Sequence, residues 1–338
     1  MKQRLLHAAH GQHVDRTPVW LMRQAGRYLK GYQVLRSKYD FLELCKTPEL
    51  AVKISLEPYE RFGVDGVILF SDIMIPAEAM GAKMAFQPGP IMEHPIATER
   101  DVAALKIADP YEKTPFVLET LKILKSEISE ETTLIGFSGC PFTTACYLVE
   151  GRHAADFPKV KKMMRQRPDL FHALLKKLTD TILNYLKAQM EAGADIVQMF
   201  DSATYLLAEK EYLAFAYPYE KRLLDGLKQK SPVILFLRDT QRFLPFIKKS
   251  GASVVSVDHH CSLTEARQIL GDEAVLQGNL DPELLKSGGK SDIQKAARRI
   301  LNETRGQKHI FNLGHGVLQG TPMKNVAALI DEVKNSAQ

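Results

Sequence analysis

The clearest sign of the fold is the stretch PVILFL, residues 232–237. It is a short apolar run rich in β-branched residues, and Arg238 and Asp239 follow it directly. A run that is apolar throughout, rather than at alternate positions, indicates a strand buried on both faces. Such strands are typical of a parallel sheet covered by helices, so further runs of this kind are expected along the chain.

Seven more runs of this kind occur, and stretches with helical periodicity such as 168–193 and 291–304 lie between them. We expect Ser291 to be the N-cap of the second of these helices. Eight strand-then-helix units in 338 residues predict an α/β fold, a single (β/α)8 TIM-type barrel that forms one domain over 1–338. Between the second and third strands, 84–96 predicts a hairpin-like excursion that turns at Gln-Pro-Gly-Pro. The seven other runs are PVWLM (18–22), GVILF (66–70), TLIGF (133–137), DIVQMF (195–200), SVVSV (253–257), AVLQG (274–278) and HIFNL (309–313).

Composition restricts the class of protein. The hydrophobic content of 45% and the charged content of 25% are ordinary for a globular protein, and a net charge of +5 is too small to indicate nucleic acid. The basic stretch at 159–167 has Met between its charges, which favours one face of a surface helix. No apolar run is long enough for a signal peptide or a membrane span, and the four cysteines show no CxxC spacing. We therefore expect reduced thiols and a cytoplasmic protein.

Polar residues follow nearly every predicted strand. In a barrel the C-terminal ends of the strands meet at one mouth, where the active site is expected. The residues in strand order are Arg23, Gln24 and Arg27; Ser71 and Asp72; Ser138 and Gly139, with Tyr147 beyond; Asp201 and Ser202; Arg238 and Asp239; Asp258, His259 and His260; Asn279 and Asp281; and Gly314, His315 and Gly316.

The stretch WLMRQAGRY, residues 20–28, places Arg23 and Arg27 four residues apart with no acid between them. Two guanidinium groups at this spacing repel each other unless they share an anion, so the pair indicates an anion site, although a solvated surface is an alternative.

Several other strand-end residues also have structural alternatives. Asp72 and Ser202 could cap the helices that follow them, and Tyr147 could be a core residue. Asp281 precedes a Pro and is expected to be an N-cap, whereas His315 lies between two glycines and favours a site residue.

Several classes of site are absent from the pattern. There is no GxGxxG or GxxxxGK[ST] loop for nucleotides and no GxSxG nucleophile elbow. His259 and Cys261 form an H-x-C arrangement that could hold zinc with a further thiolate, but the other cysteines are poorly placed for it. The remaining set of arginines, a carboxylate, a phenol, a hydroxyl and an imidazole suits a polyanionic organic ligand and a reaction without an external cofactor.

Six segments in order closely resemble the signature segments of the uroporphyrinogen decarboxylase family, and the resemblance runs from about residue 16 to about residue 333. They are WLMRQAGRYL, FSDIMIPAEAMG, GFSGCPFTTACYLVEG, QMFDS, LQGNLDP and FNLGHGV. The resemblance implies a (β/α)8 barrel, usually a homodimer, and a carboxy-lyase of haem biosynthesis. It implies removal of the four acetate carboxyls of uroporphyrinogen III, which gives coproporphyrinogen III and CO2 with no metal or cofactor.

The resemblance also implies roles for individual residues. The Asp72 carboxylate would accept pyrrole N–H groups and stabilise the cation formed when a pyrrole is protonated. Arg23 and Arg27 would hold substrate carboxylates, and Arg23 would also help to position the reacting group. The remaining substrate-binding residues implied are Tyr147, Ser202 and His315 at acetates or propionates, Gln24, Ala25 and Gly26 through their backbone, and Phe200 against the macrocycle.

The sequence departs from the family pattern at several places around the mouth. The family usually has a Gly-rich stretch after the fifth strand, where this chain has Arg238-Asp239-Thr240, and a Trp where this chain has His259. Lys30-Gly31 and Ala203 also differ. A zinc-dependent methyltransferase of the same superfamily, acting on corrinoid or thiol substrates, is the main alternative function. A tetrapyrrole-binding protein without turnover is a third.

Overall fold

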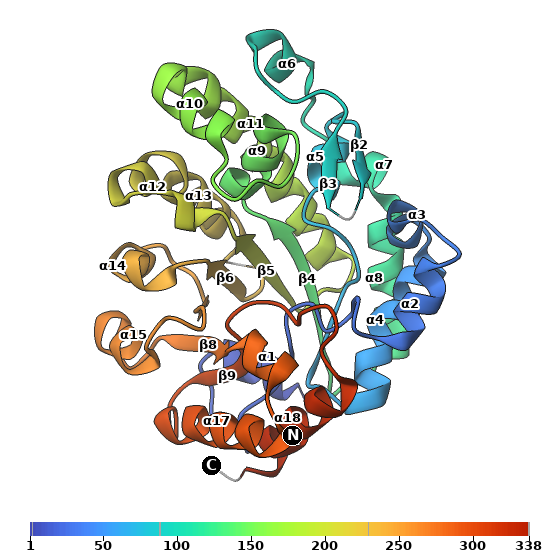
Figure 1. Cartoon of the computed structure of the whole chain (residues 1–338), viewed down its shortest axis with the longest axis vertical. Helices are drawn as coiled ribbons and strands as arrows, with labels where there is room; N and C mark the ends of the chain where they lie inside the picture. Colours follow the sequence, from blue (N-terminus) through green and yellow to red (C-terminus); the bar gives the residue numbers. More distant parts are fainter. Residues whose placement is uncertain (2, 88, 229, 337–338) are drawn as a thin grey trace.

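The computed structural model describes residues 1, 3–87, 89–228 and 230–336. Seven parallel strands form one curled sheet in the order β1-β4-β5-β6-β7-β8-β9, and helices surround it (Figure 1). The strands of this sheet are β1 Gly66–Ile68, β4 Thr133–Gly139, β5 Ile196–Asp201, β6 Val233–Leu237, β7 Val254–Ser256, β8 Val275–Leu280 and β9 His309–Leu313.

These seven strands confirm seven of the eight predicted runs. Every residue in them is buried except Phe200, which is half-buried near the end of β5. Burial on both faces explains why the runs are mostly apolar, because helices cover the outside while side chains fill the inside.

The first predicted strand is wrong as a regular strand. Val19 forms a single bridge to Phe311 of β9, and its carbonyl accepts a hydrogen bond from the backbone N–H of Asp65, next to β1, at 2.9 Å. The N–H of Trp20 donates to the carbonyl of Phe311 at 3.4 Å, but three other backbone donors of this segment bond to side chains. The N–H of Val19 donates to Asp65 Oδ2 at 2.8 Å, and the N–H of Met22 donates to Asn312 Oδ1 at 2.9 Å. The segment therefore lies between the two edges of the sheet without completing a ladder with either.

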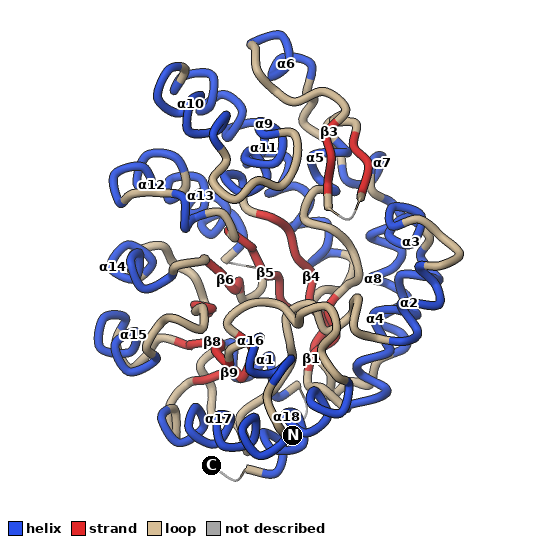
Figure 2. Tube along the Cα trace, viewed as in Figure 1, coloured by secondary structure: helices blue, strands red, loops and turns tan. Residues whose placement is uncertain are grey.

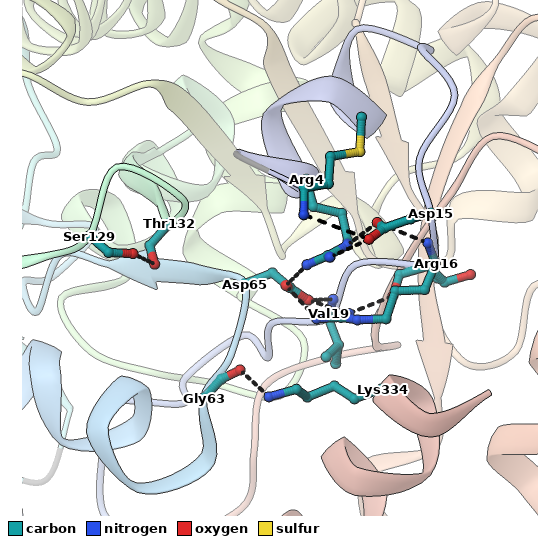
Figure 3. Close-up of polar contacts among 11 residues, drawn as sticks. Arg4, Asp15, Arg16, Val19, Gly63, Asp65, Ser129, Thr132 and Lys334 are labelled. Carbon is teal, nitrogen blue, oxygen red and sulfur yellow. Dashed lines mark hydrogen bonds and ion pairs between the residues drawn. The ribbon is translucent and has the colours of Figure 1, made fainter. Parts of the chain in front are cut away.

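Asp65 is the centre of a polar cluster that holds this segment (Figure 3). Its carboxylate accepts from Arg4 Nη1 at 2.9 Å, and from Nη1 and Nη2 of Arg16 at 2.8 Å each, in addition to the backbone of Val19. Asp65 is only 8% exposed, and the arginine side chains are 14% and 15% exposed. The cluster therefore ties helix α1 (Arg4–Ala9) and the first predicted strand to the start of β1.

A chain of polar side chains crosses the interior of the curled sheet. Trp20 Nε1 donates to Gln277 Oε1 of β8 at 2.9 Å, and Gln277 Nε2 donates to Gln198 Oε1 of β5 at 3.1 Å. Because β5 and β8 are not neighbours in the sheet, this contact shows that the sheet curls far enough for its inner faces to meet.

The helices agree with the predicted periodicity in most places. α11 spans Pro168–Glu191, which begins where predicted and ends two residues earlier, and the basic stretch lies on a helix, α10, as predicted. The prediction for Ser291 is wrong, because α17 begins one residue earlier at Lys290 and Gly289 is its N-cap. The other helices are α2 Lys30–Arg36, α3 Phe41–Lys46, α4 Pro48–Phe62, α5 Ile75–Ala79, α6 Glu99–Ala104, α7 Pro110–Lys113, α8 Pro115–Glu127, α9 Pro141–Glu150, α10 Pro158–Gln166, α12 Glu209–Phe215, α13 Tyr217–Leu227, α14 Leu244–Ile247, α15 Leu263–Leu270, α16 Pro282–Ser287, α17 Lys290–Glu303 and α18 Met323–Asn335, with 3-10 turns η1 Thr204–Leu206 and η2 Thr240–Phe243.

Two features complete the description. β2 (Met84–Phe86) and β3 (Pro90–Met92) pair antiparallel and stand apart from the main sheet (Figure 2). The turn predicted between them includes Pro88, which lies outside the described residues. Among the helices of the described residues, none has the length and apolar character to cross a membrane.

Candidate active site

The residues predicted at the strand ends come together at one mouth. Arg23 interacts electrostatically with Asp72, which follows β1, and with Tyr147 on α9. The charge of Arg27 lowers the pKa of Arg23, and the charge of Arg23 lowers the pKa of His315, which follows β9. Segments from both ends of the chain therefore meet here, as the parallel topology requires.

The surroundings of Arg23 combine burial by protein with access to solvent. Its side chain is exposed, yet burial by surrounding protein lowers the pKa of its guanidinium. Both observations hold where a side chain is enclosed by protein but still reached by water. Gly316 makes room for it, because a Cβ there would lie 2.3 Å from Arg23 Cδ. Arg23 itself has a φ of 59°, a left-handed conformation that is rare for a residue with a long side chain.

Asp72 is half-buried beside the two arginines, and its carboxylate is held on one side only. Its Oδ1 accepts from the backbone N–H of Met74 at 2.8 Å, just before α5, so the capping alternative describes one of its two oxygens. Its Oδ2 makes no hydrogen bond to the described residues. Burial raises the pKa of Asp72 to about 6, against the opposing effects of the Met74 N–H, Arg23 and Arg27. An oxygen without a partner in a desolvated setting suits a carboxylate that receives donors from a ligand.

His315 presents a neutral imidazole to the same mouth. Its Nδ1 accepts from the backbone N–H of Gly316 at 2.7 Å, so the neutral ring carries its proton on Nε2. Burial, together with the charges of Arg23 and Arg238, lowers the pKa of His315 to about 3. The ring is therefore a neutral N–H donor at ordinary pH, and Phe236 supports it edge-on at 5.8 Å between ring centroids.

Aromatic residues line one side of the site. Phe200 packs in T-shaped geometry against Phe137 at 5.8 Å and against Phe236 at 6.1 Å. Tyr147 is half-buried and packs against Phe157 at 5.8 Å, and burial raises the pKa of its hydroxyl. Because Phe200 is the one residue of the main strands with an open face, this group offers an apolar surface to a flat ligand.

Ser202 is half-buried after β5, and it does not cap the turn that follows. The turn η1 begins after Ala203, which provides no side-chain hydrogen bond. The Ser202 hydroxyl makes no hydrogen bond to the described residues, so it is open to a ligand.

The side chain of Gln24 has a structural role. It is buried, its Oε1 accepts from the backbone N–H of Leu21 at 3.0 Å, and its Nε2 donates to the carbonyl of Gly66 at 2.9 Å. These bonds fasten the arginine-bearing segment to β1. Ala25 and Gly26 are half-buried, so a ligand would meet this segment through its backbone.

A buried polar group beneath β5 was missed by the sequence interpretation. The Thr143 hydroxyl donates to the carboxyl of Asp201 and accepts from the backbone N–H of Ala203 at 3.0 Å, while Tyr212 donates to Glu220 at 2.7 Å. Burial and the neighbouring Asp201 raise the pKa of Glu220 well above its usual range. This group supports the end of β5, and no motif in the sequence connects Glu220 of α13 with it.

The H-x-C arrangement lies near the mouth. Cys261 is buried, and burial raises the pKa of its thiol to about 12. Within the part of the chain that the structure describes, no group of three or more His, Cys, Asp or Glu side chains is arranged to hold a metal ion.

The fold and the site define a parallel α/β protein in which arginines and an open carboxylate gather at the C-terminal ends of the strands. The sequence profile of the family "Uroporphyrinogen decarboxylase (URO-D)" matches residues 1–336. The chain is 46% identical to the uroporphyrinogen decarboxylase of Trichlorobacter lovleyi and 47% identical to that of Geotalea uraniireducens, each over 340 residues and 100% of both chains. The chain belongs to the uroporphyrinogen decarboxylase family.

Solved structures show how widely this fold is shared. A methyltransferase from Methanosarcina mazei superposes with a TM-score of 0.85 at 25% identity, covering 98% of each chain. A B12-independent methionine synthase from Shewanella superposes with a TM-score of 0.59 at 13% identity, over 94% of this chain and 93% of that one. The second likeness shows the fold alone.

Proposed function

We propose that this protein decarboxylates the four acetate side chains of uroporphyrinogen III to methyl groups, giving coproporphyrinogen III and CO2 without a cofactor. Full-length identity of 46–47% to decarboxylases supports it. The observation in the structure that carries the proposal is the half-buried Asp72 carboxylate, which keeps one oxygen open beside Arg23 and Arg27.

The chemistry explains why no cofactor is required. Each step converts one CH2–COO⁻ group and one proton into CH3 and CO2. When the C–C bond to the carboxylate breaks, its electron pair needs an acceptor, and a pyrrole protonated at a ring carbon is one. The substrate therefore supplies the electron sink that a cofactor supplies in other decarboxylases.

Asp72 has the central role in this proposal. Pyrrole N–H groups point inward in the reduced macrocycle, and one carboxylate can accept several of them. The negative charge also stabilises the cation that forms on protonation, and it acts strongly because the site is partly desolvated. Arg23 holds the reacting carboxylate in place rather than delivering the proton, because a guanidinium is a very weak acid even with its pKa lowered by burial.

The other residues hold the periphery of the substrate. Arg27 binds a carboxylate, and His315 after β9 and Tyr147 on α9 donate hydrogen bonds to acetates or propionates. The neutral Nε2–H of His315 suits this role because it donates without adding a charge. The remaining proposed contacts are the Ser202 hydroxyl, the open ring face of Phe200, and the backbone of Gln24, Ala25 and Gly26.

We also propose that residues 1–338 form one closed (β/α)8 barrel, with 84–96 as its excursion, that works as a homodimer in the cytoplasm. Bonds from the first predicted strand to both β9 and the start of β1 support closure of the barrel. The four cysteines are free and buried, which suits a reducing compartment. The dimer rests on the family resemblance.

A zinc-dependent methyl transfer is the second candidate, and the likeness to the Methanosarcina mazei methyltransferase favours it. Identity to that protein is 25%, whereas identity to the decarboxylases is 46–47% over the full chain. A zinc site needs several ligands close together, and the described residues of this chain contain no group of three or more His, Cys, Asp or Glu side chains arranged to hold a metal ion. Decarboxylation is therefore the function that we favour.

The direct test is anaerobic incubation of EDTA-treated protein with uroporphyrinogen III, followed by oxidation and separation of the products by carboxyl number. We expect products with seven, six, five and four carboxyls to appear in turn. Unchanged eight-carboxyl substrate with folded protein would contradict the proposal, and transfer of a methyl group to a thiol after zinc is restored would support the second candidate.

Replacing Arg27 with alanine is expected to weaken substrate binding by about 2 kcal/mol, the scale for losing a charged hydrogen-bond partner. The side chain is exposed in the mouth, so the fold should be retained. The dissociation constant of uroporphyrin, measured by fluorescence titration, checks the prediction. Unchanged affinity would mean that Arg27 is a solvated surface residue and does not bind substrate.

The raised pKa of Asp72 predicts a dependence of kcat/KM on pH. The proposed role needs the carboxylate, so kcat/KM should fall as the pH drops through about 6, where Asp72 becomes protonated. Because the pKa of Asp72 is higher in the folded state than in the unfolded chain, the folded state binds this proton first as the pH falls below about 6. Protonation of Asp72 therefore stabilises the folded state there and does not cause unfolding. A profile that stays flat to pH 5 in folded protein would contradict this prediction.

A further inference from the structure

Arg238 is a cation in the mouth that neither the family resemblance nor the proposed mechanism uses. It directly follows β6 and its side chain is exposed. Its guanidinium carbon lies over the ring of Tyr205 at 4.5 Å from the centroid, a cation–π contact. The Tyr205 hydroxyl donates to the carbonyl of Ala155 at 3.0 Å, which fixes the ring on which the guanidinium rests. The guanidinium is therefore oriented before any ligand arrives.

Two acids near Arg238, Asp239 and Asp258, are bonded to other groups. Asp239 pairs with Arg242 at 2.7 Å. The Asp258 carboxylate accepts from the backbone N–H groups of Thr240 at 3.1 Å, of His260 at 3.0 Å and of Asp239. Among the described residues Arg238 has no carboxylate partner. Its hydrogen-bonding edges are thus open on the side that faces the solvent of the mouth.

Two observations place this open guanidinium at the substrate site. The charge of Arg238 lowers the pKa of His315, as the charge of Arg23 does, so both arginines lie near this imidazole. Tyr205, which carries Arg238 on its ring, also raises the pKa of Tyr147. Arg238 therefore lies on the β6 side of the mouth, whereas Arg23 and Arg27 precede α2.

His259 borders the same side of the mouth and acts on His315. It packs tightly against Gly314, where a Cβ would come within 2.0 Å of the His259 backbone nitrogen. Its Nδ1 is buried without a hydrogen-bond partner among the described residues. Arg238 and His259 therefore lie on the same side of the mouth, at two of the positions where the chain departs from the family pattern.

We propose that Arg238, held on Tyr205, forms a second carboxylate subsite that binds a peripheral acetate or propionate of the tetrapyrrole. The inference rests on the proposed function. Uroporphyrinogen carries eight carboxylates, and arginines on only one side of the mouth would leave the far side of the macrocycle without a charge partner. A guanidinium opposite them would fix how the ring turns between steps, which makes Arg238 a specificity-determining residue.

The test compares Arg238→Gln with wild type and with Arg222→Gln, a control that removes an exposed arginine of α13 paired with Asp180. Two constants are measured anaerobically: the KM for uroporphyrinogen III and the inhibition constant of the product coproporphyrinogen III, which retains only propionates. We expect Arg238→Gln to raise the KM about tenfold or more, the fold-change for loss of a charged hydrogen bond. The control should change neither constant.

The two constants distinguish the two kinds of carboxylate. A rise in both means that Arg238 binds a propionate, and a rise in the KM alone means that it binds an acetate; either result supports the subsite. Arg238→Lys keeps the charge but loses the planar stacking, so an intermediate rise is expected, and it also serves as the test if the Gln variant does not fold. If both constants stay within about twofold of wild type, the subsite is wrong. If wild type itself releases no CO2, the proposed function fails instead.

Discussion

Replacing Asp72 with asparagine is expected to lower kcat by about 10²- to 10³-fold, the range for removing one preorganised group that stabilises developing charge. The two side chains have the same shape, and the amide oxygen can still accept from the Met74 N–H that holds Oδ1 now. The substitution replaces Oδ2, the oxygen without a partner, with an NH2 group. This group cannot accept hydrogen bonds from pyrrole N–H groups, and it brings no negative charge to stabilise the cation.

The measurement is the steady-state kcat for the first decarboxylation, with melting temperature and circular dichroism to establish that the variant is folded. Asp281→Asn is the matched control, because Asp281 also follows a strand of the main sheet, β8, but caps α16 through the N–H of Glu283. Asparagine is a good N-cap, so the control should keep nearly full activity. A kcat for Asp72→Asn close to that of wild type would refute the role given to Asp72.

Replacing Asp65 with asparagine is expected to cost about 3–5 kcal/mol of unfolding free energy, the scale for removing one partner of a buried ion pair. Arg4 and Arg16 would keep their charges in a largely desolvated place with no carboxylate to balance them. The backbone of Val19 would also lose its charged acceptor, so the segment between β9 and β1 would loosen. The arginines at the other end of that segment should then be held less firmly.

Urea unfolding of the wild type and the variant gives the difference in free energy directly. Asp15→Asn is the control, since Asp15 bonds to Arg4 as well but is half exposed, and exposed ion pairs contribute at most about 1 kcal/mol. Equal costs for the two variants would mean that burial of the Asp65 cluster does not matter for stability. A raised KM in the Asp65 variant would show that the cluster also positions Arg23 and Arg27.

The strands of the main sheet were predictable because they are buried on both faces. That burial favours apolar runs, of which VILFL in β6 is the clearest because it contains no polar residue. The first predicted strand has the same composition, but a backbone N–H can donate to a side chain as readily as to a neighbouring strand. The bond from Val19 to Asp65 joins residues 46 positions apart, and no local pattern reveals it.

The candidate site was predictable to the extent that it depends on topology. Parallel strands place Arg23, Asp72, Tyr147 and His315 at one mouth whatever their rotamers. Their states were not predictable, since the neutral form of His315 depends on burial and on two arginines distant in sequence. The stacking of Arg238 on Tyr205 was likewise hidden, because it joins the turn η1 to the residue after β6, and these are far apart in the sequence.

The shared fold does not decide between decarboxylation and methyl transfer. The Methanosarcina mazei methyltransferase has nearly the same backbone as this protein, with a TM-score of 0.85. A barrel supports many reactions by changing the side chains at its strand ends. The distinction therefore rests on those side chains and, above all, on the open carboxylate of Asp72.

A crystal structure of the protein bound anaerobically to coproporphyrinogen III tests this claim most directly. The account predicts that an Asp72 carboxylate oxygen lies about 2.7–3.2 Å from pyrrole nitrogens, with propionates on the arginines of the mouth. A macrocycle whose pyrrole N–H groups bond elsewhere, with Asp72 facing solvent, would contradict it.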